Sequence, residues 1–169
     1  FWLASTDKNG GRIGIPALWG TDAVHGHNNI VGATLFPHNI GLGAANNPDL
    51  MFQIGNVTAK EILVTGLDWT FAPTIAVVRD DRWGRTYESY SEDPTIVKEY
   101  AKYLVEGIQG KLSDNSFLDE DHLIATAKHF VGDGSTDNGI EGGVTTLSAA
   151  EVNERLLAPY REAVKGGLG

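Results

Sequence analysis

Cysteine, long apolar runs and positive charge are absent or scarce in the sequence, and each absence excludes a class of protein or partner. It contains no cysteine, which excludes disulfide bonds, thiolate nucleophiles and cysteine metal ligands. No run of about 18 apolar residues occurs, so we predict no membrane-spanning helix. Positive charge is scarce, because 13 Lys and Arg stand against 22 Asp and Glu, for a formal net charge of −9. We therefore expect neither nucleic acid nor an anionic membrane as a partner.

What the sequence does contain is typical of one globular domain. Its 169 residues are 41% apolar, enough for a core, and its 21 glycines predict many tight loops. The chain begins at Phe1 rather than Met and ends on "VKGGLG", so we expect both ends to be cuts. Residues 1–169 are thus predicted to form a single partial domain.

The chain repeats one pattern three times, with an apolar strand, a long loop and a helix in each unit. Asn47 and Asp93 are each followed by proline, which is typical of a helix start. Ser148 and Glu151 form a capping box, and Pro159 is expected to kink the helix that follows. The predicted strands are 13–23, 67–77 and 122–130, and the predicted helices are 48–65, 94–109 and 149–165.

Regular alternation of strands and helices predicts parallel strands joined by crossover helices. The loops after the strands are long, and the first is a glycine-rich loop predicted to run to Asn46. Because α/β folds place their sites at the C-terminal ends of parallel strands, we expect the site in these loops. A doubly wound sheet would fit three strands. The cut-like ends favour an incomplete (β/α)8 TIM-like barrel of about three to four β/α units, since a whole barrel needs about 250 residues.

The stretch "ATAKHFVGDG" ends an apolar strand with Lys128 and His129. Two readings are open: an exposed strand end with solvated side chains, or a polar cluster at the rim of a site. In the second reading, a carboxylate of the next loop keeps Lys128 charged, and the candidates are Asp133, Asp137 and Glu141.

Two other strand ends carry polar residues. Asp22 in "WGTDAVHGH" either caps the next turn or accepts hydrogen bonds from a ligand. The loop "RDDRWGRTYESYSED" contains Arg85, which can donate two parallel hydrogen bonds. Glu88 and Glu92 of the same loop are either an acid/base pair or capping and surface groups, and the second reading is favoured.

His25 and His27 form an H-x-H pair, which in some barrel enzymes binds a metal. With Asp22 as a third ligand and Lys128 as a polarising group, they would predict a metal-dependent hydrolase. The pair alone is a weak signal, and the alternative is that it stabilises its own loop.

A neutral sugar needs both acceptors and donors, because each hydroxyl does both. Asp22, Arg85, Lys128 and His129 are such a set, with contributions from three strand ends. Their charges sum to about +1 with neutral histidine, so the pocket need not share the acidic average of the chain.

Three stretches carry a resemblance to a known family: "GIPALWGTDAVHGHNNIVGATLFPHNIGLGAANNPDL", "FAPTIAVVRDDRWGRTYESYSEDP" and "ATAKHFVGDGSTDNGI". Together they resemble the N-terminal barrel domain of glycoside hydrolase family 3, in its β-glucosidase and β-glucan exohydrolase branch. The resemblance covers about residues 12–165, and the three strands resemble the second, third and fourth of the barrel.

The resemblance implies roles for the polar residues. Asp22 is similar to the family's acceptor for hydroxyls of a terminal β-D-glucosyl residue, and Arg85, Lys128 and His129 resemble the donors. Glu141 resembles an acidic residue that orients the lysine. No cofactor and no metal are implied, and the expected substrate is a β-glucoside or β-glucan oligosaccharide.

The resemblance also implies retaining hydrolysis by an aspartate nucleophile and a glutamate acid/base. It places the aspartate in an "SDW"-like motif on a later strand and the glutamate on a following domain, and neither stretch occurs here. No catalytic residue is therefore expected in this chain. The remainder of the barrel and the second domain become expected partners, and the chain alone is predicted to be inactive or a non-catalytic sugar-binding fragment.

Overall fold

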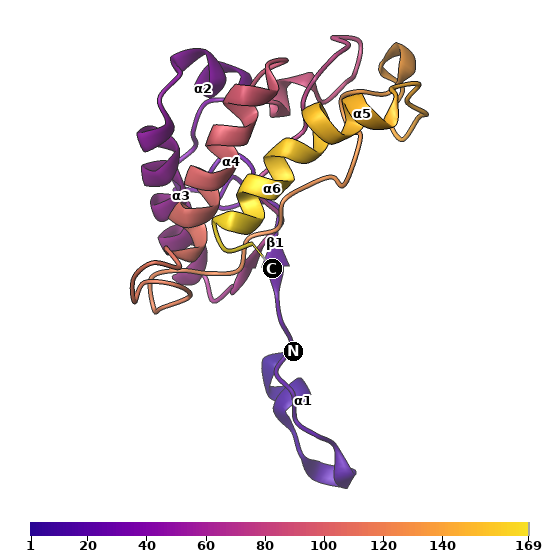
Figure 1. Ribbon diagram of the computed structural model, residues 1–169. Coiled ribbons are helices and arrows are strands. Elements are labelled where there is room, and N and C mark those ends of the chain that lie inside the picture. The colour runs from indigo at the N-terminus through magenta and orange to yellow at the C-terminus, as the bar shows by residue number, and fades with distance from the viewer. Residues whose placement is uncertain (169) are drawn as a thin grey trace.

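A computed structural model gives the arrangement of residues 1–168 (Figure 1). The α-helices are α1 (Trp2–Thr6), α2 (Asn39–Ala45), α3 (Pro48–Leu63), α4 (Pro94–Gln109), α5 (Ala149–Glu151) and α6 (Leu157–Lys165). The strands are β1 (Gly20–Thr21) and β2 (Trp69–Thr70). Short 3₁₀ turns are η1 (Asn9–Gly11), η2 (Thr86–Glu88) and η3 (Asp137–Gly139), and η4 (Val152–Leu156) is π-helical.

Three extended segments run parallel, in the order in which they occur along the chain. β1 pairs with β2, with Gly20 opposite Trp69. The third segment lies beside the second one and pairs with it through isolated parallel bridges at Ile124 and Lys128. The predicted parallel arrangement of the three extended segments is therefore confirmed.

The regular strands are shorter than the predicted ranges 13–23, 67–77 and 122–130. Only Gly20–Thr21 and Trp69–Thr70 are strands, and the third segment makes bridges alone. Pro73 has no N–H to donate, so it interrupts the ladder after β2. Residues before β1 leave the body of the molecule as an arm that carries α1 (Figure 1).

The predicted helix starts are correct, and local hydrogen bonds explain them. The side chain of Asn47 accepts from the Leu50 amide at 3.1 Å, at the start of α3. Asp93 caps α4 in the same way through the Thr95 amide at 2.8 Å. The predicted capping box before α5 is also present.

The distortion expected at Pro159 takes the form of a wide turn. The residues just before it, Val152–Leu156, are π-helical, and α6 continues from Leu157. Proline cannot donate to the carbonyl one turn back and its ring crowds that carbonyl, so a wider turn relieves the conflict.

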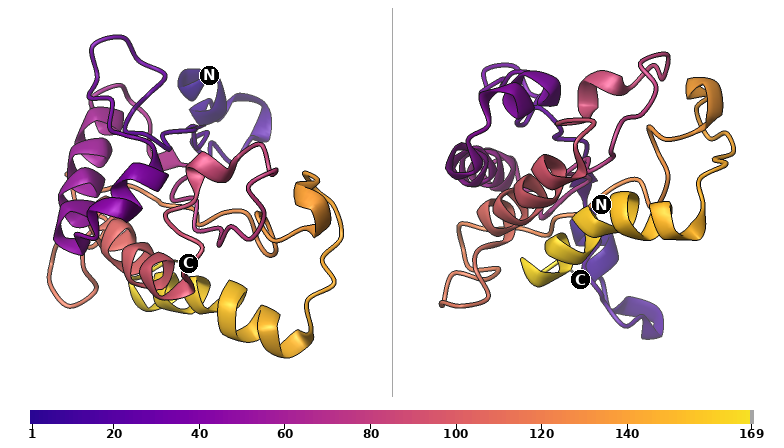
Figure 2. Two further views of the ribbon diagram at one scale, coloured as in Figure 1. Left: turned by 90° about the horizontal axis from the view of Figure 1, so that it is seen from above. Right: turned by 45° about the horizontal axis from the view of Figure 1, so that its top comes forward.

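Helices α3, α4 and α6 lie side by side and cover one side of the parallel segments (Figures 1 and 2). Their apolar faces meet in one core, in which the side chains predicted as the stripe of α4 are at most 7% exposed: Val97, Tyr100, Ala101, Leu104 and Ile108. Within residues 1–168, no helix is both long and apolar enough to cross a bilayer.

Helix α2 lies in the stretch that was predicted to be a loop. Its glycines disfavour a helix, but packing against the loop before α4 outweighs this preference. The fit requires glycine at one position, because a Cβ on Gly43 would lie 1.7 Å from the carbonyl oxygen of Tyr90. At Gly41 the nearest atom to such a Cβ is 3.9 Å away.

We expect Gly43→Ala to lower the free energy of unfolding by about 2 kcal/mol, because the helix or the loop must move to admit the methyl group. Gly41→Ala in the same helix is the control and should be neutral or stabilising by up to about 1 kcal/mol. Urea unfolding monitored by circular dichroism compares the two variants. Equal stability of the two would mean that α2 does not pack closely on the loop.

Candidate functional site

The four predicted polar residues lie at the C-terminal ends of the parallel segments. Asp22 follows β1, Arg85 lies directly before η2, and Lys128 and His129 end the third segment. All four line one open cleft with a volume of about 540 Å³. The rest of its wall consists of Val24, Phe71, Glu88 and Thr126. The structure thus brings the predicted set together, and its role in ligand binding stays a prediction.

Lys128 is held by Asp22 across the cleft. Its ammonium nitrogen lies 2.5 Å from Asp22 Oδ1, and the lysine side chain is only 12% exposed. Glu141 was expected to orient Lys128. In the structure Glu141 instead accepts a hydrogen bond from Trp83 Nε1 and lies 3.7 Å from Arg85.

Arg85 forms a two-pronged contact with Glu88. Its Nε donates to Oε1 at 2.7 Å and its Nη2 to Oε2 at 2.8 Å, while Thr74 adds a hydrogen bond to Oε2 at 3.3 Å. Burial raises the pKa of Glu88, but the hydrogen bonds and charge of Arg85 outweigh this effect, so the net pKa is lowered. The hydrogen bonds to Glu88 in turn raise the pKa of Arg85.

Glu88 was assigned to the surface, and that assignment was wrong. Its side chain is 7% exposed, whereas Glu92 is exposed as expected. The sequence does contain a signal: a carboxylate three residues after an arginine, in a loop long enough to fold inward. Nothing in the sequence separates it from the other carboxylates of this acidic loop.

His129 contacts charged groups with both ring nitrogens. Its Nδ1 lies 2.6 Å from Asp133 Oδ2, an ion-pair distance without the alignment of an ideal hydrogen bond. Its Nε2 lies 3.5 Å from Arg85 Nη1. Of the loop carboxylates considered for Lys128, Asp133 therefore faces the histidine instead. Asp137 accepts from Thr146 within its own loop.

The predicted net charge of about +1 needs correction, because Glu88 also lines the cleft. Lys128 is balanced by Asp22, and Arg85 is balanced by Glu88. With a neutral histidine, the charged groups that line the cleft cancel. Such a surface suits an uncharged ligand with many hydroxyl groups.

The two histidines of the H-x-H pair contact different partners. His27 is buried, and its Nε2 lies 3.0 Å from the Thr65 hydroxyl. His25 Nε2 instead lies 3.3 Å from His38 Nδ1. Burial lowers the pKa of both His25 and His27. In the part of the chain that the structure describes, no three His, Asp or Glu side chains gather as metal ligands, so the metal-dependent alternative lacks a ligand set there.

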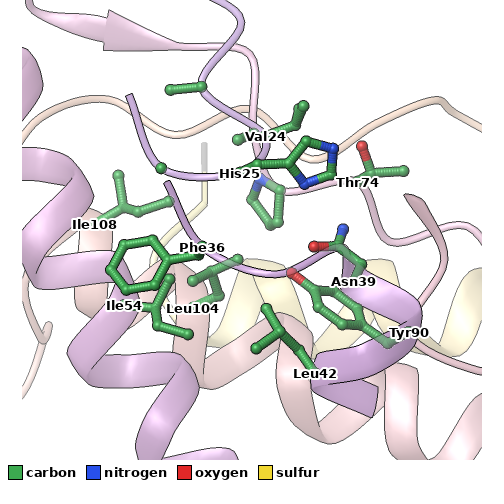
Figure 3. A pocket seen from close by; sticks show the side chains of 14 residues that line it. Val24, His25, Phe36, Asn39, Leu42, Ile54, Thr74, Tyr90, Leu104 and Ile108 are labelled. Carbon is green, nitrogen blue, oxygen red and sulfur yellow. The ribbon is translucent and has the colours of Figure 1, made fainter. Parts of the chain in front are cut away.

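A small cavity, separate from the cleft, is lined by core residues and shares Val24 with the cleft wall (Figure 3). It has a volume of about 20 Å³, with Phe36 and Ile54 on the apolar side and His25, Asn39 and Thr74 on the polar side. The Asn39 amide donates to the backbone carbonyl of Glu88 at 2.7 Å. Helix α2 thereby fixes the turn that presents Arg85 and Glu88.

Comparison with known proteins identifies the family of this chain. Residues 2–169 match the family described as "Glycosyl hydrolase family 3 N terminal domain". The chain belongs to glycosyl hydrolase family 3. This confirms the family resemblance and a TIM-like barrel as the relevant architecture, to which the chain contributes parallel β/α units.

Several family 3 members are similar over most of the chain. A solved exo-1,3/1,4-beta-glucanase from a Pseudoalteromonas species is 56% identical, with a TM-score of 0.95 over 99% of this chain and 21% of that one. Another is a beta-glucosidase from Listeria innocua in complex with glucose, 33% identical, with a TM-score of 0.82 over 94% of this chain and 21% of that one. A curated relative, a beta-xylosidase of Formosa agariphila, is 35% identical over 94% of this chain and 22% of its own length. The chain thus spans about a fifth of the length of these proteins.

Proposed function

We propose that this chain supplies the glycosyl-binding part of a family 3 glycoside hydrolase that removes terminal, non-reducing β-D-glucosyl residues with retention. One observation carries the proposal: Asp22, Arg85, Lys128 and His129 come from three separate segments and line one cleft. A neutral pyranose fits such a surface, because its hydroxyls both donate and accept. The Phe71 ring supplies an apolar wall for the ring carbons.

The cleft is suited to binding and orientation rather than to bond cleavage. Retaining hydrolysis needs two carboxyl groups about 5–5.5 Å apart, one as nucleophile and one as acid and then base. Asp22 and Glu88 are both engaged with cations here. We infer that both catalytic groups lie outside residues 1–169. Contacts to the distant hydroxyls then hold the anomeric carbon in place, and their energy assists the chemical step.

A β-xylosidase is the second candidate, and it is favoured by the name of the Formosa relative. Xylose and glucose are both neutral pyranoses and differ only by the hydroxymethyl group on C5. The cleft is open, so its walls within residues 1–168 do not by themselves exclude that group.

The test is hydrolysis by the full-length protein. It is expected to cleave aryl β-glucosides faster than aryl β-xylosides, and proton NMR should show the β-anomer as the first product. Residues 1–169 alone should give no turnover, and glucose binding without turnover by the full-length protein would favour the non-catalytic alternative. Cleavage by residues 1–169, or a first product of α configuration, would contradict the proposal. A higher kcat/KM for xylosides would select the second candidate.

A further inference from the structure

Two asparagine side chains hold the backbone of the residues whose carboxylates pair with the cations of the cleft. Asn39, the first residue of α2 (Figure 3), donates from Nδ2 to the Glu88 carbonyl at 2.7 Å and is 2% exposed. Asn29, in the loop before α2, donates from Nδ2 to the Asp22 carbonyl at 3.0 Å. Both ion pairs of the cleft are therefore tied to one short stretch of chain.

The Glu88 carbonyl needs a partner from outside its own turn. It lies at the end of η2, which is closed by a hydrogen bond from the Glu88 amide to the Arg85 carbonyl at 2.9 Å. The last carbonyl groups of a helical turn have no partner within that turn. No backbone amide of residues 1–168 donates to the Glu88 carbonyl, whereas the Asn39 side chain does. Helix α2 thus caps η2 from a different part of the chain.

This cap fixes the guanidinium of Arg85 through Glu88. The Glu88 carboxylate accepts from Arg85 at 2.7 and 2.8 Å and from the Thr74 hydroxyl at 3.3 Å. A two-pronged contact sets the plane of a guanidinium as well as its position. If the backbone at Glu88 rotates, its carboxylate and the guanidinium therefore move together.

The stretch that carries both asparagines is itself anchored. Glu61 on α3 accepts from the Thr34 amide at 2.9 Å and from the Thr34 hydroxyl at 2.7 Å. The Phe36 amide donates to the His25 carbonyl at 3.1 Å. Residues 25–39 are thereby tied to the helix layer and folded back on themselves. Donors on such an anchored stretch can hold their acceptors in one place.

We propose that Asn39 is a positioning residue that acts through Glu88 on Arg85. Asn29 has the same role toward Asp22 with a smaller effect, because Asn29 is exposed and water can replace its amide. Neither asparagine is part of the cleft wall that the structure describes, so each acts through another residue. This deepens the proposed function and rests on it.

The first experiment removes each amide from the full-length protein. Asn39→Leu keeps a similar volume without the donor, and both it and Asn39→Ala should lower kcat/KM for an aryl β-glucoside about tenfold, because the buried Glu88 carbonyl loses its partner. Asn29→Ala should lower it by about threefold or less. Asn56→Ala is the matched control and should change it by less than about twofold, since the Asn56 amide donates to the Phe52 carbonyl within α3. Equal kcat/KM in wild type and Asn39→Leu would overturn the proposal.

The second experiment separates positioning from a general loss of stability. If Asn39 acts through the ion pair, its amide has little left to position once Glu88→Gln has removed that pair. The double variant should therefore match Glu88→Gln alone in kcat/KM within about twofold, at a temperature where circular dichroism shows every variant folded. A loss in the double variant equal to the product of the two single losses would contradict positioning through Glu88.

The third experiment needs no substrate. In nitrogen-15 NMR of arginine-labelled full-length protein, the Nε–H of Arg85 should exchange slowly, because it donates to Glu88 at 2.7 Å. Its exchange should become faster in Asn39→Leu and stay unchanged in Asn56→Ala. An Arg85 signal that is the same in wild type and Asn39→Leu would overturn the proposal. Failure of the full-length protein to cleave any neutral glycoside would instead remove the proposed function and leave the NMR result standing.

Discussion

Glu88→Gln in the full-length protein is expected to lower kcat/KM for an aryl glucoside by about two orders of magnitude. The glutamine amide places an N–H group against the guanidinium of Arg85, where Glu88 now accepts at 2.7 and 2.8 Å. Truncation of one partner of a buried, hydrogen-bonded charge pair costs about 2–5 kcal/mol, although Arg85 is about a third exposed and retains some solvent. The released arginine no longer has a fixed position beside the sugar. Steady-state kinetics measures the loss.

Glu92→Gln is the matched control, because Glu92 lies in the same loop but is exposed. It should change kcat/KM by less than about twofold. Equal effects of the two substitutions would show that the whole loop, and not the buried pair, sets the activity.

The pair of Arg85 and Glu88 also predicts that the free energy of unfolding falls at acidic pH. The pKa of Glu88 is lowered in the folded protein, so its contribution to folding is present above its unfolded pKa of about 4.3 and is lost as pH falls through the folded value. Urea unfolding between pH 3 and pH 6 should therefore show a shallower loss of stability for Glu88→Gln than for the wild type.

The sequence predicted the helices of this chain well because their start signals are local. Asn47, Asp93 and Ser148 each accept from an amide two or three residues away, so no distant contact is needed. Helix α2 could not be predicted in this way. Its stability depends on the fit of Gly43 against the Tyr90 carbonyl, which is a tertiary contact.

The gathering of the cleft residues was predictable, and their pairing was not. Parallel strands bring their C-terminal ends to one edge, which explains why Asp22, Arg85 and Lys128 meet. Which carboxylate meets which cation depends on how the long loops fold. As a result, Lys128 pairs with Asp22 over 106 residues of sequence, while the nearer Glu141 turns to Trp83 and Arg85.

The cations that line the cleft share one feature, which is an acidic partner. Lys128 and Arg85 each have a carboxylate partner, Asp22 and Glu88 respectively. A paired cation keeps its charge and orientation while it is partly buried. The donors are thereby fixed before a sugar binds, and the entropy lost on binding is smaller.

Lys128→Met should weaken the inhibition of the full-length protein by glucose about 10- to 150-fold, with a similar loss in kcat/KM. A hydrogen bond to a charged group contributes about 1.5–3 kcal/mol, and methionine retains the buried apolar stem while it removes the ammonium group. The free energy of unfolding should change little, because the Asp22 side chain is 58% exposed and water can replace its partner.

Lys102→Met is the control for loss of a lysine on the surface. Lys102 lies on α4, 3.8 Å from Glu106, and its side chain is 44% exposed. It should leave both glucose inhibition and kcat/KM unchanged, since an exposed ion pair contributes at most about 1 kcal/mol to stability. Lys128→Arg should not restore activity, because a planar guanidinium cannot occupy the position of the compact ammonium beside Asp22. Unchanged glucose inhibition in Lys128→Met would mean that this lysine only neutralises Asp22 and does not touch the sugar.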